Sequence, residues 1–397
     1  MTALELSVIV ASAPSLASTT YLFFLTLFAA TPSSRSFRPP RTRFDIVVPA
    51  HNEEAGIAKT VESLRAVDYP RELTRVLVVA DNCTDATAHN ARSAGAIVLE
   101  RTNADRRGKG YALDFAFEAS AREYVADAVV VVDADTVVSP NLLRAFATRF
   151  EEDGAHAVQA EYGVANAEAS WRTRLMRIAF ALFHTLRSNA RERLALSAGL
   201  RGNGMGFSHT LLAKFPHDAY SVVEDVEYGI RIGRGGYRVH YVGESRVLGE
   251  MAASQNAAVS QRRRWEGGRF GLVRQHAGSL LRGGLAGDRI QLDLAFDLLV
   301  PPLTYIVALS LAGTVAAVAL AMHLGRMTPA LYPWALSCAF LAAYLIRGVV
   351  LAGVGLRGAL ALLWAPFYMI WKIGLLLRKP AHKKGEWVRT MRDEETR

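Results

Sequence analysis

Cysteine and charge are both scarce in this chain of 397 residues. Its 2 cysteines, Cys83 and Cys338, lie far apart, which excludes a disulfide framework and a zinc cluster of cysteines. Only 21% of the residues are charged and 51% are hydrophobic, so the chain is not intrinsically disordered. Its 31 glycines and 14 prolines are ordinary for this length, which excludes a collagen-like or low-complexity polymer.

Acidic residues are fewer than basic ones. The chain has 46 Lys and Arg against 37 Asp and Glu, which gives a net charge of +9 and a pI of about 9.7. Such an excess is typical of proteins that bind nucleic acid or an anionic membrane surface. The mean hydropathy of +0.14 is high for a purely soluble protein of this length. The location of the basic residues has to decide between these two classes.

The first part of the chain almost lacks charge. Leu6 to Ser34 contains none, and its most apolar stretch, residues 16–30, is long enough with its flanks to cross a hydrocarbon core of about 30 Å. We expect residues 1–34 to form a membrane anchor. A cleavable signal peptide is the alternative, but the only charge before the run is the acidic Glu5. The basic flank that follows is expected on the cytoplasmic side and consists of Arg35, Arg38, Arg41 and Arg43.

Residues 290–378 are apolar again and predict a membrane region of about three helices. The expected segments are Leu298–Met322, Met327–Ile346 and Gly358–Leu377, the last of which carries Lys372. If all of them span and the preceding domain is cytoplasmic, the basic tail 379–397 lies outside, against the positive-inside tendency. The third segment, which also contains Pro366, is therefore either spanning, interfacial or re-entrant.

Between the apolar regions, residues 44–280 are interpreted as one α/β domain that ends in an amphipathic helix at the membrane surface. Apolar, β-rich runs alternate there with helical stretches. The expected strands are Phe44–Val48, Val76–Ala80, Ala96–Leu99 and Ala128–Val132, and the expected helices begin near Glu54, Thr84, Lys109 and Pro140. This alternation predicts a mostly parallel sheet flanked by helices, in which ligands bind at the carboxyl ends of the strands.

Carboxylates follow several of these strands. Asp81 follows the second expected strand, and Asp133-Ala134-Asp135 follows the fourth. Because buried carboxylates repel one another, this edge of the sheet should hold something cationic. Two aspartates on one short turn offer hard oxygen ligands that suit Mg²⁺ or Mn²⁺ together with phosphate oxygens. The alternative is a plain turn in which an aspartate caps the next helix.

Two segments that contain glycine give weaker signals. Arg107-Gly108-Lys109-Gly110 lacks the spacing of a Walker loop, but a lysine at a helix start can face a phosphate. The alternative for this segment is a solvated turn. Gly202-Asn203-Gly204-Met205-Gly206 does not match a dinucleotide-binding loop, and we interpret it as a close approach of backbone to a ligand.

Two helical segments complete the set. Val223-Glu224-Asp225-Val226-Glu227 places acidic residues at the start of a helix that should end near Arg234, where they serve either the helix dipole or catalysis. Gln261-Arg262-Arg263-Arg264-Trp265 begins a long basic helix. Beside membrane segments, such a helix indicates contact with lipid headgroups or phosphates rather than with nucleic acid.

Taken in order, these elements resemble the catalytic domain of glycosyltransferase family 2. The resemblance covers residues 44 to about 275 and is nearest to the membrane-integrated branch of cellulose, chitin and hyaluronan synthases and exopolysaccharide transferases. The matching elements are Val48-Pro49-Ala50-His51-Asn52-Glu53, Asp81, Asp133-Ala134-Asp135, Glu224-Asp225, and Gln261 with Arg264-Trp265. Val223 stands where the family has threonine, and the membrane region is smaller than that of a cellulose synthase.

The resemblance implies a GT-A fold, a nucleotide-sugar donor, commonly a UDP-sugar, and Mg²⁺ or Mn²⁺. It assigns donor contacts to Pro49, Ala50, His51, Asn52, Glu53, Asp81, Lys109 and Asp133. Asp135 would hold the metal, and Asp225, with Glu224 beside it, would be the catalytic base. Gln261, Arg264 and Trp265 would form a cap over the pyrophosphate and the acceptor.

We therefore expect a membrane-bound, metal-dependent, inverting glycosyltransferase that extends a polysaccharide or exopolysaccharide. The alternatives are transfer of a single sugar to a lipid-linked acceptor and, in another class, a non-catalytic membrane protein that binds nucleotide sugars. The expected location is the inner (plasma) membrane, multi-pass, with the catalytic domain in the cytoplasm. The expected partners are the donor, a glycan or glycolipid acceptor and membrane lipids, but no nucleic acid; a secretion partner is left open.

Overall fold

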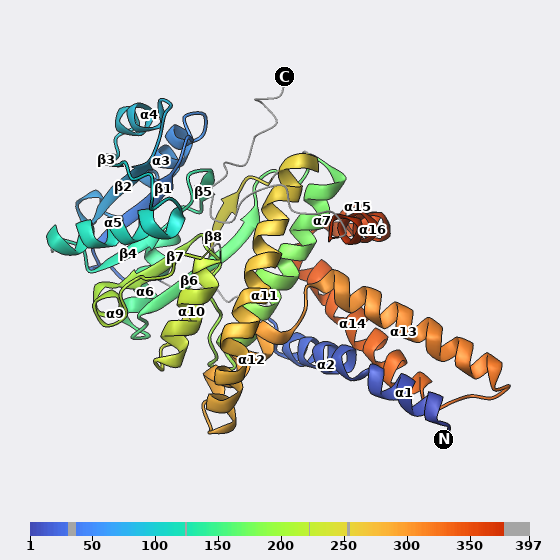
Figure 1. The fold of residues 1–397 in the computed structure, drawn as a ribbon. Helices are drawn as coiled ribbons and strands as arrows, with labels where there is room; N and C mark the ends of the chain where they lie inside the picture. The colour runs from blue at the N-terminus through green and yellow to red at the C-terminus, as the bar shows by residue number, and fades with distance from the viewer. Residues whose placement is uncertain (31–36, 124, 222, 252–254, 377–397) are drawn as a thin grey trace.

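The computed structural model describes residues 1–30, 37–123, 125–221, 223–251 and 255–376. The side chains of residues 255–267, 357, 371, 373, 375 and 376 lie outside the described part. An α/β lobe and a bundle of apolar helices project in different directions, and long helices join them (Figure 1). The predicted tail 379–397 and Arg35 of the basic flank fall outside the described residues.

An eight-stranded sheet forms the centre of the α/β lobe, in the order β3-β2-β1-β4-β7-β6-β8-β5. The strands are β1 (Phe44–Ala50), β2 (Thr74–Asp81), β3 (Ile97–Arg101), β4 (Ala128–Val131), β5 (Thr136–Val138), β6 (Ala157–Val164), β7 (Met205–Ser208) and β8 (Val239–Gly249). The first four strands are parallel to one another, and β6 is parallel to β8, whereas β7 runs antiparallel to β4 and β6 and β5 runs antiparallel to β8. The predicted α/β class and mostly parallel sheet are confirmed.

Helices cover both faces of this sheet (Figure 1). They are α3 (Ile57–Arg65), α4 (Thr87–Ser93), α5 (Lys109–Glu123), α6 (Leu142–Glu151), α9 (His209–Lys214) and α10 (Glu224–Arg234), with a short turn η1 (Arg71–Leu73) before β2. Successive residues of β1 point to opposite faces, so Ile46 and Val48 belong to one apolar cluster and Val47 to the other. Every residue of β1 is buried, which explains its apolar sequence; its one charged residue, Asp45, pairs with Arg75 at 2.7 Å.

Two long helical segments connect the sheet to the bundle. One runs through α7 (Trp171–Phe180), the π-helical turn η2 (Ala181–Leu186) and α8 (Arg187–Arg193). The other consists of α11 (Gln255–Leu285) and α12 (Arg289–Leu299). The basic helix α11 begins at Gln255, earlier than the expected Gln261. The stretch from Gln255 to Gln261 contains no proline or glycine, so nothing in the sequence prevents the helix from starting at Gln255.

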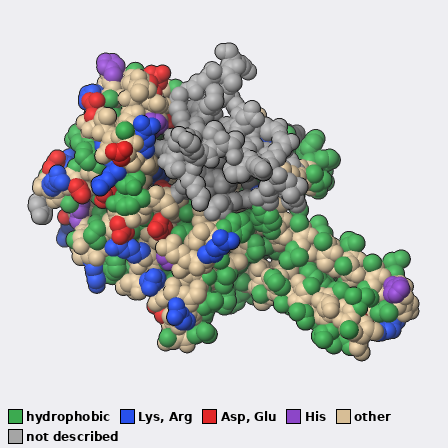
Figure 2. Space-filling model, viewed as in Figure 1, with side chains coloured by type: hydrophobic (Ala, Val, Ile, Leu, Met, Phe, Trp, Pro, Cys, Tyr) green, Lys and Arg blue, Asp and Glu red, His purple; other side chains and the backbone are tan. Residues whose placement is uncertain are grey.

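The bundle contains the helices that are long and apolar enough to cross a membrane. They are α1 (Ala3–Ala11) continued by α2 (Ala13–Phe28), α13 (Leu303–His323) and α14 (Leu331–Ala352). Ser15 of α2 and Ser310 of α13 join by a 2.7 Å hydrogen bond, and the Phe23 and Phe340 rings stack at 4.4 Å. Figure 2 shows hydrophobic side chains over the bundle and charged ones over the α/β lobe.

The third predicted C-terminal segment differs from the other two. It folds into α15 (Gly355–Ala359), η3 (Leu360–Trp364) and α16 (Ala365–Leu376), which are too short to count among the spanning helices. Its Trp364 stacks on Trp171 of α7, with ring centroids 5.6 Å apart. This segment therefore packs at the end of the bundle nearest the α/β lobe, as Figure 1 shows.

Candidate active site

A cavity of about 680 Å³ opens at the carboxyl ends of the strands and extends toward the apolar helices. It is lined by most of the site residues predicted from the sequence, which come from well-separated parts of the chain. These residues are Pro49, His51, Glu53, Lys109, Asp133, Asp135, Glu224 and Asp225. The predicted convergence of the carboxylates on one edge of the sheet is thus seen in the structure.

The remaining residues of the predicted nucleotide-binding set support this edge from behind. Ala50, Asn52 and Asp81 are not among those that line the cavity. Asp81 is fully buried, bonds Arg101 at 2.5 Å, and its backbone carbonyl lies 2.7 Å from Nδ1 of His51. Asn52 adopts a left-handed backbone (φ 56°) and accepts the Thr84 amide at 2.8 Å. These contacts fix the two loops that carry His51 and Glu53.

The Asp133-Ala134-Asp135 turn is held in place from both sides. The Asp133 amide donates to Oδ1 of Asn203 at 3.1 Å, and the Asn203 side chain donates in turn to Thr136 at 2.8 Å. The Ala134 carbonyl accepts the Thr60 hydroxyl at 2.8 Å. Asn203 is fully buried in the glycine-containing segment, so this segment positions the acidic turn.

Lys109 links the acidic turn to the second acidic pair. Its Nζ donates to Asp133 Oδ1 and to the Gly202 carbonyl, both at 2.5 Å, and lies 4.0 Å from Glu224. Burial by itself would lower the pKa of Lys109, but Asp133 and Glu224 outweigh that effect and the net pKa is raised. Lys109 is therefore a permanent cation among these carboxylates, which contradicts the alternative of a solvated turn.

Glu224 and Asp225 open α10 at the floor of the cavity. Burial raises the pKa of both carboxyls, and the positive charge of Lys109 opposes that rise. A Cβ at Gly202 would lie 3.4 Å from Oδ2 of Asp225, and Gly202 has φ +78°, a conformation that favours glycine. The backbone of this segment therefore lies close to Asp225, and its expected approach to a ligand stays a prediction. A carboxyl whose pKa is shifted toward neutrality suits a general base.

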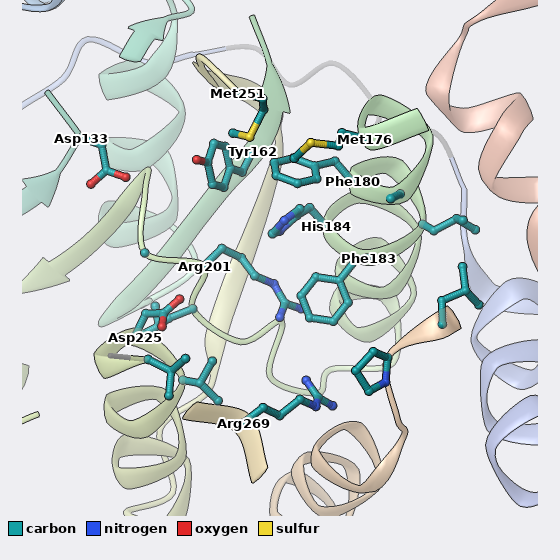
Figure 3. Close-up of a pocket in the computed structure, with 18 of the residues that line it drawn as sticks. Asp133, Tyr162, Met176, Phe180, Phe183, His184, Arg201, Asp225, Met251 and Arg269 are labelled. Atoms are coloured by element: carbon teal, nitrogen blue, oxygen red, sulfur yellow. The ribbon is translucent and has the colours of Figure 1, made fainter. Parts of the chain in front are cut away.

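The opposite wall of the cavity is aromatic and was not predicted from the sequence. The ring centroids of Tyr162 of β6 and Phe180 of α7 are 5.2 Å apart, and those of His184 and Phe180 are 4.6 Å apart (Figure 3). Burial and the neighbouring Arg201 and Arg187 lower the pKa of His184 far below its usual value, so this imidazole is neutral. The sequence signal for this wall was weak, because Tyr162 looks like an ordinary strand residue, and Phe180 and His184 look like ordinary members of an apolar helix.

The acidic turn fits a divalent cation that shares its shell with the ligand. Among the described residues, no group of three or more His, Cys, Asp or Glu could hold a metal ion by itself. However, Mg²⁺ and Mn²⁺ are bound in many phosphate sites by one or two carboxylates, with phosphate and water oxygens completing the shell. Asp133 and Asp135 both line the cavity and supply such oxygens. The donor set thus fits a metal that is completed by a diphosphate.

The predicted cap lies on α11. Gln261, Arg264 and Trp265 belong to this helix, but their side chains fall outside the described part of the chain. Arg269 and Leu272, farther along the same helix, line the cavity. The helix therefore runs along the site, and the three cap assignments stay predictions.

Comparisons with known proteins show which sequences and structures this chain is similar to. YdaM of Bacillus subtilis, a probable glycosyltransferase, is 24% identical over 265 residues, or 64% of this chain and 61% of that protein. The beta-monoglucosyldiacylglycerol synthase of Nostoc sp. is 28% identical over 230 residues, or 56% of this chain and 48% of that protein. The chain thus spans between about half and three fifths of the length of these curated relatives.

A solved structure matches over more of the chain. The mannosyltransferase PcManGT from Pyrobaculum calidifontis, in complex with GDP-Man and Mn²⁺, has a TM-score of 0.55 and 23% identity. The match covers 87% of this chain and 98% of that one, which shows the GT-A-like fold expected from the sequence. Residues 39–268, more than half of the chain, match the family described as "Glycosyltransferase like family 2". The chain therefore belongs to that family.

Proposed function

We propose that this chain is a membrane-bound, inverting glycosyltransferase that uses a nucleotide sugar, with a UDP-sugar as the first candidate. The observation that carries the proposal is the convergence of Lys109, Asp133, Asp135 and Asp225 on one cavity from separate segments. A pure binding protein would not require a carboxyl with a raised pKa beside a cationic lysine. An enzyme that removes a proton from an acceptor and stabilises a leaving diphosphate requires both.

Asp225 is the proposed catalytic base. It would take the proton of the acceptor hydroxyl while that oxygen attacks the anomeric carbon of the sugar, and the nucleoside diphosphate leaves from the opposite side. General-base assistance of this kind contributes roughly 10²–10⁴-fold to rate. Glu224, 4.0 Å from Lys109, would help to hold that lysine near the donor. Such a single displacement inverts the configuration at the anomeric carbon.

Asp135, with Asp133 beside it, is the proposed holder of Mg²⁺ or Mn²⁺. When bound, such an ion neutralises the negative charge that develops on the leaving diphosphate. Lys109 contributes a second positive charge from the protein, because it bonds Asp133 at 2.5 Å and remains protonated. The loops of His51 and Glu53 would border the nucleotide, and Gln261, Arg264 and Trp265 would cover the pyrophosphate and the acceptor from α11.

The acceptor is proposed to be lipid-linked. The far part of the cavity is lined by side chains of the apolar bundle and of α16, including Val307, Leu345 and Met369. An apolar lining of this kind suits a hydrocarbon chain better than a hydrated glycan. A growing polysaccharide is the second candidate, which the resemblance of the Gln261-x-x-Arg264-Trp265 element to polymer-forming enzymes favours.

We also propose a multi-pass plasma-membrane protein with its α/β lobe in the cytoplasm. Arg38, Arg41 and Arg43 follow α2 at the lobe end of the bundle, as the positive-inside rule expects. At the other end, Arg326 pairs with Glu5 at 2.8 Å. With three spans, the chain returns to the lobe side after α14, so that a C-terminal segment lying at the interface would keep the basic tail on the cytoplasmic side.

A donor screen tests the proposal. The full chain in detergent would be incubated with UDP- and GDP-sugars, Mg²⁺ or Mn²⁺, and a lipid extract, with nucleotide release and product mass as readouts. Metal-dependent release with a product heavier by one sugar supports the lipid-linked reading, and a ladder of products supports polymer synthesis. Binding of a nucleotide sugar without release or product from any donor would contradict an enzyme. Asp68→Asn, on the exposed side of the α/β lobe, is the matched control for carboxylate variants.

A further inference from the structure

Arginines line the cavity between its acidic and its apolar parts (Figure 3). Arg187 of α8, Arg201 before the glycine-containing segment and Arg269 of α11 all contribute to its lining. None of these residues is needed for the proposed base or metal. A cationic side chain between an active site and a lipid-facing cavity calls for an explanation, because burying charge is costly.

The Arg201 side chain is buried and only partly hydrogen-bonded. It is 8% exposed, and its Nε has no hydrogen-bond partner among the described residues. Its Nη2 donates to the Ala198 carbonyl at 3.0 Å, and the guanidinium lies 4.2 Å from the centroid of the Phe183 ring. Within the described chain, Arg201 makes no ion pair with a carboxylate. Figure 3 shows it extending away from Asp133 and toward Phe183.

Arg269 lies on the same side of the cavity as Phe183 (Figure 3). Its Nη2 donates to the carbonyls of Leu298 at 3.3 Å and Val300 at 3.0 Å, at the C-terminal end of α12. These contacts orient the guanidinium by one of its nitrogens. A guanidinium has five N–H donors, so a fixed Arg269 can still donate to an anion in the cavity.

The charge around this arginine-lined part of the cavity is not balanced. Asp297 accepts from Arg187 at 3.3 Å and from Arg191 at 2.7 Å, and Asp293 pairs with Arg191 at 3.0 Å. Arg201 and Arg269 are the additional cations, and they have no carboxylate partner among the described residues. Burial and the positive charges of Arg191 and Arg187 lower the pKa of Arg201 to about 10, although Asp297 opposes this. The site therefore has room for an added negative charge.

We propose that Arg201 and Arg269 bind the phosphate of a lipid acceptor, whose hydrocarbon chain occupies the apolar part of the cavity. This inference rests on the proposed function, and it adds the chemistry of the acceptor to it. A phosphate accepts bidentate hydrogen bonds from planar guanidinium groups, and its negative charge compensates both cations. It would lie between the base Asp225 and the side chains of Val307 and Leu345, which is where an acceptor headgroup must lie.

A neutral lipid and the donor diphosphate are the competing occupants. A neutral headgroup would leave the buried cations uncompensated. The donor diphosphate is already served by Lys109 and by the acidic turn with its metal, and the Arg201 guanidinium points away from that turn (Figure 3). The position and direction of the arginines thus favour an anion that comes from the membrane side.

Binding of two matched probes to the wild-type chain tests the proposal without any turnover. Farnesyl phosphate and farnesol share one hydrocarbon chain and differ in the phosphate. We expect the full chain in detergent to bind farnesyl phosphate at least about tenfold more tightly, as charge-assisted contacts require. Equal binding of the two would overturn the proposal. Inorganic phosphate binding as tightly as farnesyl phosphate, or UDP displacing farnesyl phosphate from the same site, would overturn it as well.

The variant Arg201→Gln locates the phosphate. It should reduce the preference for farnesyl phosphate by about tenfold and leave UDP affinity within about twofold of wild type. Arg122→Gln, an exposed arginine on α5 that pairs with Glu118, is the matched control and should change neither. Equal losses of UDP and farnesyl phosphate binding would assign Arg201 to the donor instead. Arg201→Lys, which keeps the charge, should keep part of the preference; if Arg201→Gln does not fold, this variant and the wild-type comparison decide.

These outcomes also separate this proposal from the proposed function. A chain that binds farnesyl phosphate through Arg201 but releases no nucleotide from any sugar donor would contradict the enzyme and leave the phosphate site intact. A chain that transfers sugar to a neutral lipid, with no preference for farnesyl phosphate over farnesol, would contradict the phosphate site and leave the enzyme intact.

Discussion

Two charged clusters lie along one cavity, and they differ in which sign is in excess. At the sheet edge, Asp133, Asp135, Glu224 and Asp225 gather around Lys109, and burial raises the pKa of the acidic pair. At the arginine-lined part of the cavity, arginines gather around Asp297, whose pKa is held far below its usual range by Arg191 and Arg187 despite its burial. The first cluster lacks positive charge, and the second lacks negative charge.

This difference shows what each cluster is built to receive. A buried cluster that neutralises itself would be a structural element, since its charges need nothing from outside. A buried cluster with one sign in excess is costly unless a ligand of the opposite sign completes it. We therefore read the acidic cluster as a site for a divalent cation with its diphosphate and the arginine cluster as a site for an anion. Four predictions follow this contrast from its strongest consequence to its weakest.

The variant Asp225→Asn should have the largest effect on activity. An amide of the same shape cannot accept the proton of the acceptor, so transfer should fall by roughly 10²–10⁴-fold. UDP binding should survive, because the acidic turn and Lys109 are unchanged. Nucleotide release and UDP affinity would be measured on the same preparation, with Asp68→Asn as the control. Transfer at a rate near that of wild type would remove Asp225 from the role of base.

The variant Asp297→Asn should have the largest effect on stability. The Asp297 carboxylate faces Arg187 and Arg191 in a buried position, and its loss leaves Arg187 without a carboxylate partner and Arg191 with Asp293 alone. Breaking a buried pair of this kind costs about 3–5 kcal/mol. Thermal unfolding in detergent should therefore show a clearly lower Tm than wild type. Asp218→Asn, at an exposed pair with Arg231, should cost no more than about 1 kcal/mol. Similar Tm values for both variants would show that the arginine cluster does not depend on Asp297.

The variant Asp135→Ala should weaken donor binding only in the presence of metal. Loss of even an outer-shell partner lowers metal affinity by about 10–100-fold, and loss of a ligand should cost at least that. UDP affinity with Mn²⁺ should therefore fall to the value found with a chelator. Isothermal titration with and without Mn²⁺ makes the comparison, and Asp68→Asn again serves as the control. Metal-supported UDP binding that is unchanged in Asp135→Ala would place the ion elsewhere.

The sequence was sufficient for the acidic cluster but not for the arginine cluster, for a physical reason. Parallel strands end at one edge, so Glu53 and Asp133 could be placed together once the strands were recognised, whereas Asp225, which opens a helix, was assigned to the site by the resemblance to glycosyltransferase family 2. Arg201 and His184 lie on segments whose mutual position depends on how α7 and α8 cross the sheet, and local patterns do not encode that crossing. The C-terminal segment was ambiguous for a related reason. Its apolar composition is that of a membrane-spanning helix. However, Pro366 and the stacking of Trp364 on Trp171 favour short helices.

The variant Arg201→Gln should reveal a weak coupling between the two clusters, because the charge of Arg201 acts on the pKa of Asp225. The positive charge of Arg201 lowers the pKa of Asp225, against the larger rise caused by burial. A base must be deprotonated, so kcat/KM falls as the pH drops below this raised pKa. Removing Arg201 should raise the pKa further and move the acid limb to higher pH, and the move should be small because the groups form no direct ion pair. The pH profile of nucleotide release measures this shift, with Arg122→Gln as the control. An acid limb that stays in place would mean that the two clusters act independently, each completed by its own ligand.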